Sequence, residues 1–147
     1  MTREIRDARP EDLEEWLELW EAYLEFYEVE IAFDITMATW ARILDPMNAL
    51  TCRVAVSDDK VIGFAHHHTH LTTWDIRPVC YLEDLFVSPD IRGAGIGKAL
   101  IDDLIALGKA RDWASIYWIT AEKNKTAQKL YDSYGKRDEF FRYSLTL

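Results

Sequence analysis

Residues 91–100, IRGAGIGKAL, place three glycines within five positions and follow them directly with a lysine. The segment before them, CYLEDLFV at 80–87, is predicted as a strand, and apolar residues recur at helical spacing from about residue 95 to 111. A glycine-rich turn between a strand and a helix lets backbone N–H groups approach a phosphate, and the helix adds its positive N-terminal end. This stretch therefore predicts strands and helices in one fold, with an anion site at the turn.

Three kinds of turn share this composition. A dinucleotide fold needs G-x-G-x-x-G and an acid about 20 residues further on. Here the run 93–97 brings its third glycine one residue early, and no acid follows the next strand until Glu122. A nucleotide P-loop needs glycine where Arg92 stands and a hydroxyl where Ala99 stands. The remaining readings are a coenzyme pyrophosphate loop and a structural turn that binds no ligand.

Hydrophobic periodicity and turn residues predict the order β-α-α-β-β-β-α-β-α-β. The predicted strands are 3–8, 52–57, 61–72, 80–87, 115–120 and 138–147, and the predicted helices are 10–27, 36–44, 95–111 and 126–134. No internal repeat, low-complexity segment or linker interrupts them. We expect a single mixed α/β domain over residues 1–147.

The charge is unevenly distributed within a total of −9: residues 1–90 carry 7 Lys/Arg and 19 Asp/Glu, whereas residues 91–137 carry 9 and 5. This asymmetry suits an anion near the glycines and a cation near the acids, although acids also solubilise exposed helix faces. The acidic balance argues against a nucleic-acid partner. No apolar run suits a membrane span or a leader, and Cys52 and Cys80 lack metal or redox spacing, so we expect a cytoplasmic protein without a membrane partner.

The spacing Arg92-x-x-Gly95-x-Gly97 resembles the acetyl-CoA loop of the GNAT family of N-acetyltransferases. CYLEDLFV is similar to the family strand whose backbone pairs with pantetheine, and YWITAEKNKTAQKLYDSYG is similar to the strand and helix that splay away from it. The paired signatures are most similar to polyamine and thialysine acetyltransferases and to fungal histone/polyamine acetyltransferases. The resemblance implies a GNAT fold, in which a central mixed, mostly antiparallel twisted sheet is flanked by helices and opens to admit acetyl-CoA.

The resemblance also implies the residues that bind acetyl-CoA, the co-substrate. They come from the strand, the glycine loop and the last helix: Leu85, Phe86, Val87, Arg92, Gly93, Ala94, Gly95, Ile96, Gly97, Lys98, Asn124, Ala127 and Tyr131.

Direct attack of an amine on the thioester, as the resemblance implies, needs a base, because only about one primary alkylamine in a thousand is unprotonated at pH 7. Glu83 and Asp84 are neighbours on the predicted strand, and regular alternation would point them to opposite faces. We predict Glu83 as the base and Asp84 as a cation binder, with the reverse assignment and simple ion pairing as alternatives. Tyr131 is predicted to protonate the departing thiolate, because phenol and thiol pKa values are close.

The acceptor site is predicted to include Tyr27, Glu28, Glu83, Asp84 and His68, with an amine as substrate. Residues 66–70 contain all four histidines, and alternation places those at 66, 68 and 70 on one face. No cysteine or carboxylate completes a zinc set in sequence, so no metal is predicted.

A small basic acceptor is the predicted substrate, namely a polyamine, a lysine-like amino acid or a basic side chain. The alternatives are an unrelated amine, such as an antibiotic or a protein N-terminus, and a non-catalytic domain that only binds acyl-CoA. The family resemblance and the aromatic tail FFRYSLTL lead us to expect a homodimer.

Overall fold

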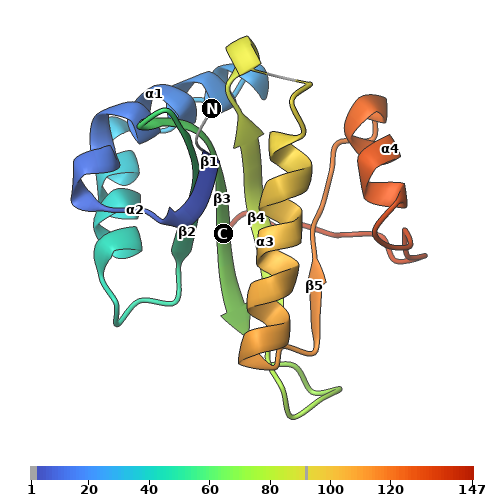
Figure 1. The fold of residues 1–147 in the computed structure, drawn as a ribbon. Helices are drawn as coiled ribbons and strands as arrows, with labels where there is room; N and C mark the ends of the chain where they lie inside the picture. The colour runs from blue at the N-terminus through green and yellow to red at the C-terminus, as the bar shows by residue number, and fades with distance from the viewer. Residues whose placement is uncertain (1–2, 92) are drawn as a thin grey trace.

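The computed structural model describes residues 3–91 and 93–147 (Figure 1). The strands are β1 (Arg3–Asp7), β2 (Thr51–Ser57), β3 (Lys60–His70), β4 (Val79–Val87) and β5 (Ser115–Tyr117). The helices are α1 (Leu13–Phe26), α2 (Phe33–Leu44), α3 (Ile96–Arg111) and α4 (Lys125–Asp132), with short 3₁₀ turns η1 (Pro10–Asp12) and η2 (Pro89–Ile91). Within these described residues, no helix is long and apolar enough to cross a membrane.

The strands form one open sheet in the order β1-β2-β3-β4-β5. Each of the first four strands pairs antiparallel with its neighbour, and β5 pairs parallel with β4. The parallel ladder joins only Val79–Tyr81 to Ser115–Tyr117. Beyond it β4 continues to Val87 while β5 has ended, so the two strands part toward the top of Figure 1. The predicted mixed, mostly antiparallel sheet is confirmed.

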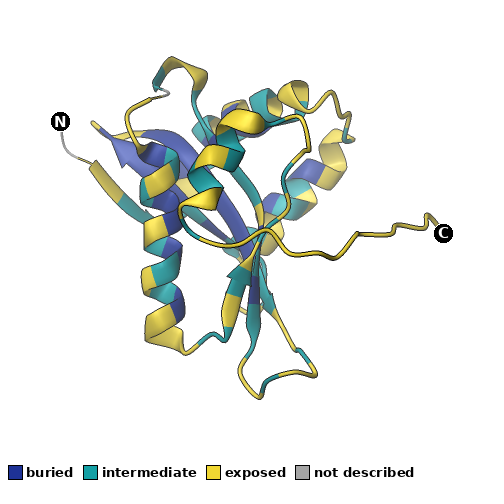
Figure 2. Ribbon diagram, turned by 90° about the vertical axis from the view of Figure 1, so that its right-hand side faces the viewer, coloured by how far each residue is buried: buried dark blue, intermediate teal, exposed yellow. Residues whose placement is uncertain are grey.

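Two apolar cores cover the two faces of the sheet. On one face α1 and α2 bury an aromatic cluster with Trp16, Trp20 and Trp40 against β2 and β3. The two tryptophans of α1 lie four residues apart and therefore share one side of the helix. On the other face α3 packs Ile96, Leu100, Ile101 and Leu104 against the sheet. The central strands are accordingly the most deeply buried part of the chain (Figure 2).

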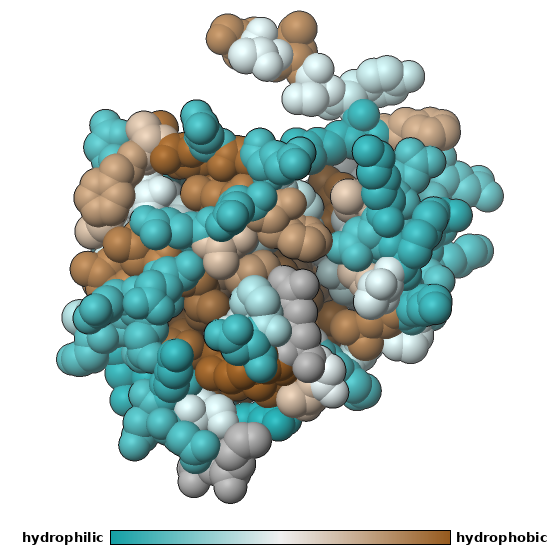
Figure 3. All heavy atoms as spheres, turned by 90° about the horizontal axis from the view of Figure 1, so that it is seen from above, coloured by the Kyte–Doolittle hydropathy of each residue, from teal (hydrophilic) through white to brown (hydrophobic). Residues whose placement is uncertain are grey.

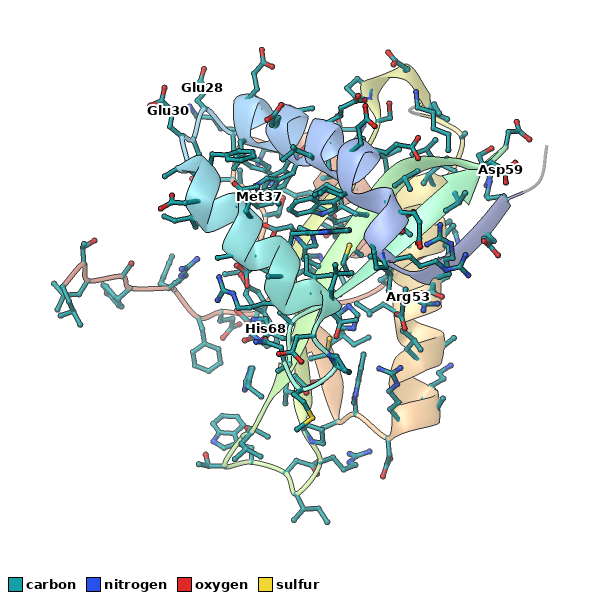
Figure 4. All side chains as sticks on the ribbon, turned by 90° about the vertical axis from the view of Figure 1, so that its left-hand side faces the viewer. Glu28, Glu30, Met37, Arg53, Asp59 and His68 are labelled. Carbon is teal, nitrogen blue, oxygen red and sulfur yellow. The ribbon has the colours of Figure 1, made fainter. Side chains whose placement is uncertain are left out.

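Arg53 of β2 holds α3 against the sheet. Its guanidinium donates two hydrogen bonds of 2.8 Å to the Asp103 carboxylate and one of 2.9 Å to Asp7 in β1. The hydrogen bonds donated to Asp103, followed by the one donated to Asp7, raise the pKa of Arg53 above its ordinary value. Figure 4 shows Arg53 between the edge of the sheet and α3. This clamp fixes the helix whose first turn forms one side of the candidate site.

The elements predicted between residues 3 and 134 are confirmed, with shifts of a few residues at their ends. The helix predicted from residue 36 begins at Phe33, and the strand predicted to reach residue 120 ends at Tyr117. Asp45 ends α2 in an extended conformation, as expected for the residue before a proline.

The strand predicted at Asp138–Leu147 is wrong for this chain, because these residues form no strand in the structure. Their large apolar side chains are at least 80% exposed: Phe140, Phe141, Tyr143, Leu145 and Leu147. Figure 2 shows the tail leaving the body of the molecule in an extended, exposed path. A strand exists only through hydrogen bonds to a neighbour, and alternation of side chains supplies no such neighbour.

Candidate active site

The glycine loop has the backbone that an anion cradle needs. Gly93 and Gly95 have φ values of 89° and 77°, in the left-handed region that other residues rarely adopt. A Cβ atom built at either position meets no atom within 4 Å, so conformation rather than crowding requires glycine there. Arg92 lies outside the described residues. Figure 3 looks onto this end of the molecule, where hydrophobic and hydrophilic residues are intermixed at the surface.

Helix α3 begins directly after this loop, with Gly95 as its N-cap and no side chain bonded to the cap. The first N–H groups of a helix have no acceptor inside the helix, and the helix dipole is positive there. Ile96 buries its side chain in the core, so it anchors the turn. The open loop and the uncapped helix end together fit a phosphate group.

Lys98 adds a positive charge one turn into α3. Its Nζ lies 2.8 Å from Asp102 Oδ2, and this hydrogen bond, followed by contact with Tyr134, raises the pKa of Lys98. The Tyr134 hydroxyl donates a 2.6 Å hydrogen bond to Asp102 Oδ1. The three side chains therefore connect the end of α4 to the first turns of α3, while the lysine keeps its charge.

Helix α4 places Tyr131 beside the segment that follows β5. Asn124 caps the helix, since its Oδ1 accepts a hydrogen bond from the Ala127 backbone N–H at 3.2 Å. The Tyr131 ring meets the Trp118 ring edge to face at 5.5 Å. It also lines a pocket of about 270 Å³ shared with β5 and residues 135–138. Burial, followed by the nearby phenol of Tyr27, raises the pKa of Tyr131 and keeps it protonated at neutral pH.

A bulge in β4 sets the positions of the two carboxylates. Opposite β4, His66 pairs with Asp84 and His67 with Leu82, which leaves Glu83 as an extra residue. Asp84 contacts His66, and Glu83 contacts His68. Because alternate residues of β3 share a face, both carboxylates lie on the face that α1 covers. The expectation that they point to opposite faces is therefore wrong.

The two carboxylates differ in environment. The Asp84 side chain is 14% exposed, whereas that of Glu83 is 49% exposed. Asp84 Oδ1 accepts a 2.7 Å hydrogen bond from the Tyr23 hydroxyl, and Oδ2 lies 3.0 Å from His66 Nδ1. Glu83 Oε1 lies 3.2 Å from His68 Nε2. One carboxylate is held by two partners under α1, and the other is open to solvent.

The end of α1 reaches this site. Tyr27 directly follows the helix, and its ring lies 4.9 Å from that of Tyr23. Its phenol is close enough to Tyr131 to influence that residue's pKa. Glu28 and Glu30 are exposed in the following loop and point outward, away from His68 on β3 (Figure 4). The structure therefore brings Tyr27 toward the carboxylates but leaves Glu28 at the periphery.

The histidines share the predicted face but differ in surroundings. The His68 ring packs edge to face on Tyr81, and His70 Nε2 lies 2.8 Å from the Tyr117 hydroxyl. His66 is instead buried, at 2% exposure. Tyr23, which contacts Asp84, was not among the predicted site residues. Its helical spacing indicated a core position and gave no signal for this contact.

Residues 9–135 match the acetyltransferase (GNAT) family. The chain belongs to this family. GNAT enzymes use acetyl-CoA as co-substrate, so the protein is an acetyl-CoA-dependent N-acetyltransferase that acts on amines. The predicted family, enzyme class and co-substrate are confirmed. β4 and β5 pair only over Val79–Tyr81 and Ser115–Tyr117 and part beyond that ladder.

Two curated relatives and one solved structure illustrate the similarity. The chain is 33% identical to the D-amino-acid N-acetyltransferase HPA3 of Saccharomyces cerevisiae over 129 residues, which span 86% of this chain and 80% of that protein. It is 31% identical to the thialysine N-epsilon-acetyltransferase of Bos taurus over 78 residues, or 53% of this chain and 45% of that protein. The ribosomal-protein-alanine N-acetyltransferase of Brucella melitensis biovar Abortus 2308 superposes with a TM-score of 0.84 at 21% identity, covering 99% of this chain and 100% of that one. This last similarity concerns the fold.

Proposed function

We propose that this GNAT enzyme acetylates a primary amine of a small basic acceptor, such as a polyamine, a lysine-like amino acid or a basic side chain. The observation that carries the proposal is the pair Glu83 and Asp84 on one face of the sheet, close to the opening between β4 and β5. Two carboxylates can serve a cationic acceptor in two ways, by binding charge and by removing a proton. The names of the relatives, which refer to amino-acid and thialysine acceptors, support the same class.

In the proposed reaction, Glu83 takes a proton from the ammonium group, directly or through water. The amine nitrogen then forms a bond to the thioester carbonyl carbon, and the bond from that carbon to sulfur breaks. The Tyr131 hydroxyl gives its proton to the departing thiolate, which the raised pKa of Tyr131 permits at neutral pH, and the phenolate recovers through water the proton that the acetylated nitrogen loses. We propose that a backbone N–H near Leu85 polarises the carbonyl.

The proposed grip on acetyl-CoA uses three elements. The backbone of β4 at Leu85, Phe86 and Val87 pairs with pantetheine, beyond the ladder to β5. The loop residues Gly93, Ala94, Gly95, Ile96 and Gly97 offer N–H groups to the pyrophosphate, and Lys98 adds charge. Asn124 and Ala127 contribute from the first turn of α4.

The test is a panel of amines with acetyl-CoA and detection of the released thiol. The panel contains spermidine, lysine, a D-amino acid, an aminoglycoside, a peptide with a free N-terminus and a monoamine. We expect the highest kcat/KM for acceptors that carry a second cationic group. Glu83→Gln is expected to lower kcat about 100-fold, the usual size of a general-base contribution. Glu18→Gln, a matched change on the exposed face of α1, is expected to keep wild-type rates.

The panel also separates the alternatives. Equal rates for spermidine and the monoamine contradict a basic acceptor, and preference for the aminoglycoside or the peptide favours those acceptors instead. Thiol release without acetylation of any amine favours a domain that only binds acyl-CoA. A Glu83→Gln variant with full kcat removes Glu83 as the base.

We also propose that the protein is a homodimer in which each tail pairs with the partner. Residues 141–147 alternate apolar and polar side chains but are exposed in the single chain, and among the described strands β5 has a neighbour on only one side. An unpaired edge and an unpaired apolar segment are complementary.

Light scattering is expected to give twice the 17.2 kDa of one chain. Phe141→Asp with Tyr143→Asp is expected to give monomers, whereas Ser144→Asp with Thr146→Asp, on the other face, keeps the dimer. A monomeric wild-type protein contradicts the proposal.

We further propose that residues 1–147 work as one domain in the cytoplasm. Cys52 and Cys80 are both free and buried, which suits a reducing compartment.

A further inference from the structure

We propose that Trp16 and His66 are positioning residues that hold the Asp84 carboxylate in place as the cation-binding group, which leaves proton transfer to Glu83. The inference rests on the proposed function, because it assigns separate roles to the two carboxylates of that site. It concerns a chain of four side chains that joins α1, β3 and β4.

The first step fixes the tautomer of His66. The Trp16 indole Nε1–H donates a 2.9 Å hydrogen bond to His66 Nε2, and both side chains are buried, at 0% and 2% exposure. An indole nitrogen can only donate, so Nε2 must accept and carries no proton. The neutral ring therefore carries its proton on Nδ1. The tautomer follows from the chemistry of the partner.

The second step concerns Asp84. His66 Nδ1–H donates to Oδ2 at 3.0 Å, and the Tyr23 hydroxyl donates to Oδ1 at 2.7 Å. Burial, followed by the charge of Asp84, raises the pKa of Tyr23, so its hydroxyl remains a donor. Donors on both oxygens fix the orientation of the carboxylate, and each oxygen keeps a lone pair for an N–H of the acceptor.

The third step separates the two carboxylates. A proton bound to either Asp84 oxygen would compete with the hydrogen bond from Tyr23 or His66. His66 cannot relay that proton, because its Nε2 already accepts the hydrogen bond from Trp16. Within the described chain Glu83 has one polar partner, His68, and its side chain is half exposed, so it can turn and take up a proton. The geometry therefore assigns charge binding to Asp84 and proton removal to Glu83.

The surrounding aromatic rings hold the chain in place. Phe64 stacks on His66 at 4.4 Å, and Trp20 lies 5.4 Å from the same ring. Cys52 lies opposite His66 on β2, and Tyr23 contacts the same carboxylate as His66; burial raises the pKa of both. With these groups neutral, Asp84 is the charge that the imidazole faces.

The experiment compares Trp16→Phe with Trp40→Phe. Both changes shrink a buried ring of one aromatic cluster, in which the two indoles lie 4.7 Å apart, but only the first removes the donor to His66. With spermidine as acceptor probe, Trp16→Phe is expected to raise the KM for the amine about tenfold. We expect less than a threefold change in kcat and no change in the KM for acetyl-CoA. Trp40→Phe is expected to leave all three within twofold after correction for folded fraction.

A second readout does not depend on turnover. In protein labelled with ¹⁵N-histidine, long-range ¹H–¹⁵N spectra are expected to show His66 as a neutral ring protonated on Nδ1, with the signal assigned through its loss in His66→Phe. A ring protonated on Nε2, or equal kinetic effects of the two tryptophan variants, overturns the proposal. If no amine is acetylated, the assigned role falls with the proposed function. The His66 tautomer then still reports whether the hydrogen bonds from Trp16 through His66 to Asp84 are formed.

Discussion

Replacing Tyr131 by phenylalanine is expected to lower kcat by about two to three orders of magnitude, while the KM for acetyl-CoA stays within about twofold. The change removes one hydroxyl and keeps the ring that packs against Trp118. Without the phenol, the thiolate must leave without a proton from the enzyme, and such contributions are usually about 10²- to 10⁴-fold. Stopped-time assays of acetylated amine, with saturating co-substrate, measure the loss directly.

Tyr134→Phe is the matched control. Tyr134 lies three residues further along the chain, and its hydroxyl donates a hydrogen bond to Asp102 instead of facing the gap between β4 and β5. We expect a lower melting temperature for it and less than a threefold change in kcat. If Tyr131→Phe retains full kcat, the acid is another group or water. If both variants lose activity equally, the effect comes from the packing of α4 and not from proton transfer.

The features predicted well from sequence depend on residues that are close together in the chain. The glycine loop and the helices α1 and α3 each follow from patterns a few positions long. Local conformational preference and hydrophobic spacing determine such features before any distant contact forms. The place of the loop between a strand and a helix was therefore predictable, and the family resemblance followed from its neighbours.

The features that sequence did not predict depend on a partner far along the chain. The bulge at Glu83 is a mismatch between two strands, so β4 alone does not reveal it. The contact between Tyr23 and Asp84 spans 61 residues, and that between Trp16 and His66 spans 50. An apolar alternation in the tail likewise indicates a strand only if a neighbouring strand exists. These contacts are the ones from which separate roles for the two carboxylates are proposed.

Wild-type protein is expected to lose about 2 kcal/mol of stability between pH 7.5 and pH 5 through His67 alone. His67 is 2% exposed, and neither ring nitrogen has a hydrogen-bond partner within the described chain. Burial, followed by the charges of Arg111 and Arg53, lowers the pKa of His67 to about 4. In the unfolded chain the value is about 6.5. Between these two values the unfolded state binds more protons, so stability falls as the pH falls, whereas above pH 6.5 the residue makes no contribution.

Urea unfolding at the two pH values, compared with His67→Leu, isolates this effect. Leucine removes the proton-binding group and fills the space beside Trp113, whose ring lies 5.8 Å from that of His67. The carboxylates titrate in both proteins, so their contributions cancel in the comparison. We expect the variant to lose about 2 kcal/mol less than wild type over this range, since each pKa unit corresponds to about 1.4 kcal/mol. His70→Leu, which changes an exposed histidine of the same strand, is expected to keep the wild-type loss. If the stability of wild type and of His67→Leu changes with pH in parallel, the protonated His67 imidazole must find a hydrogen-bond acceptor in the folded protein. Acid sensitivity would then have another source.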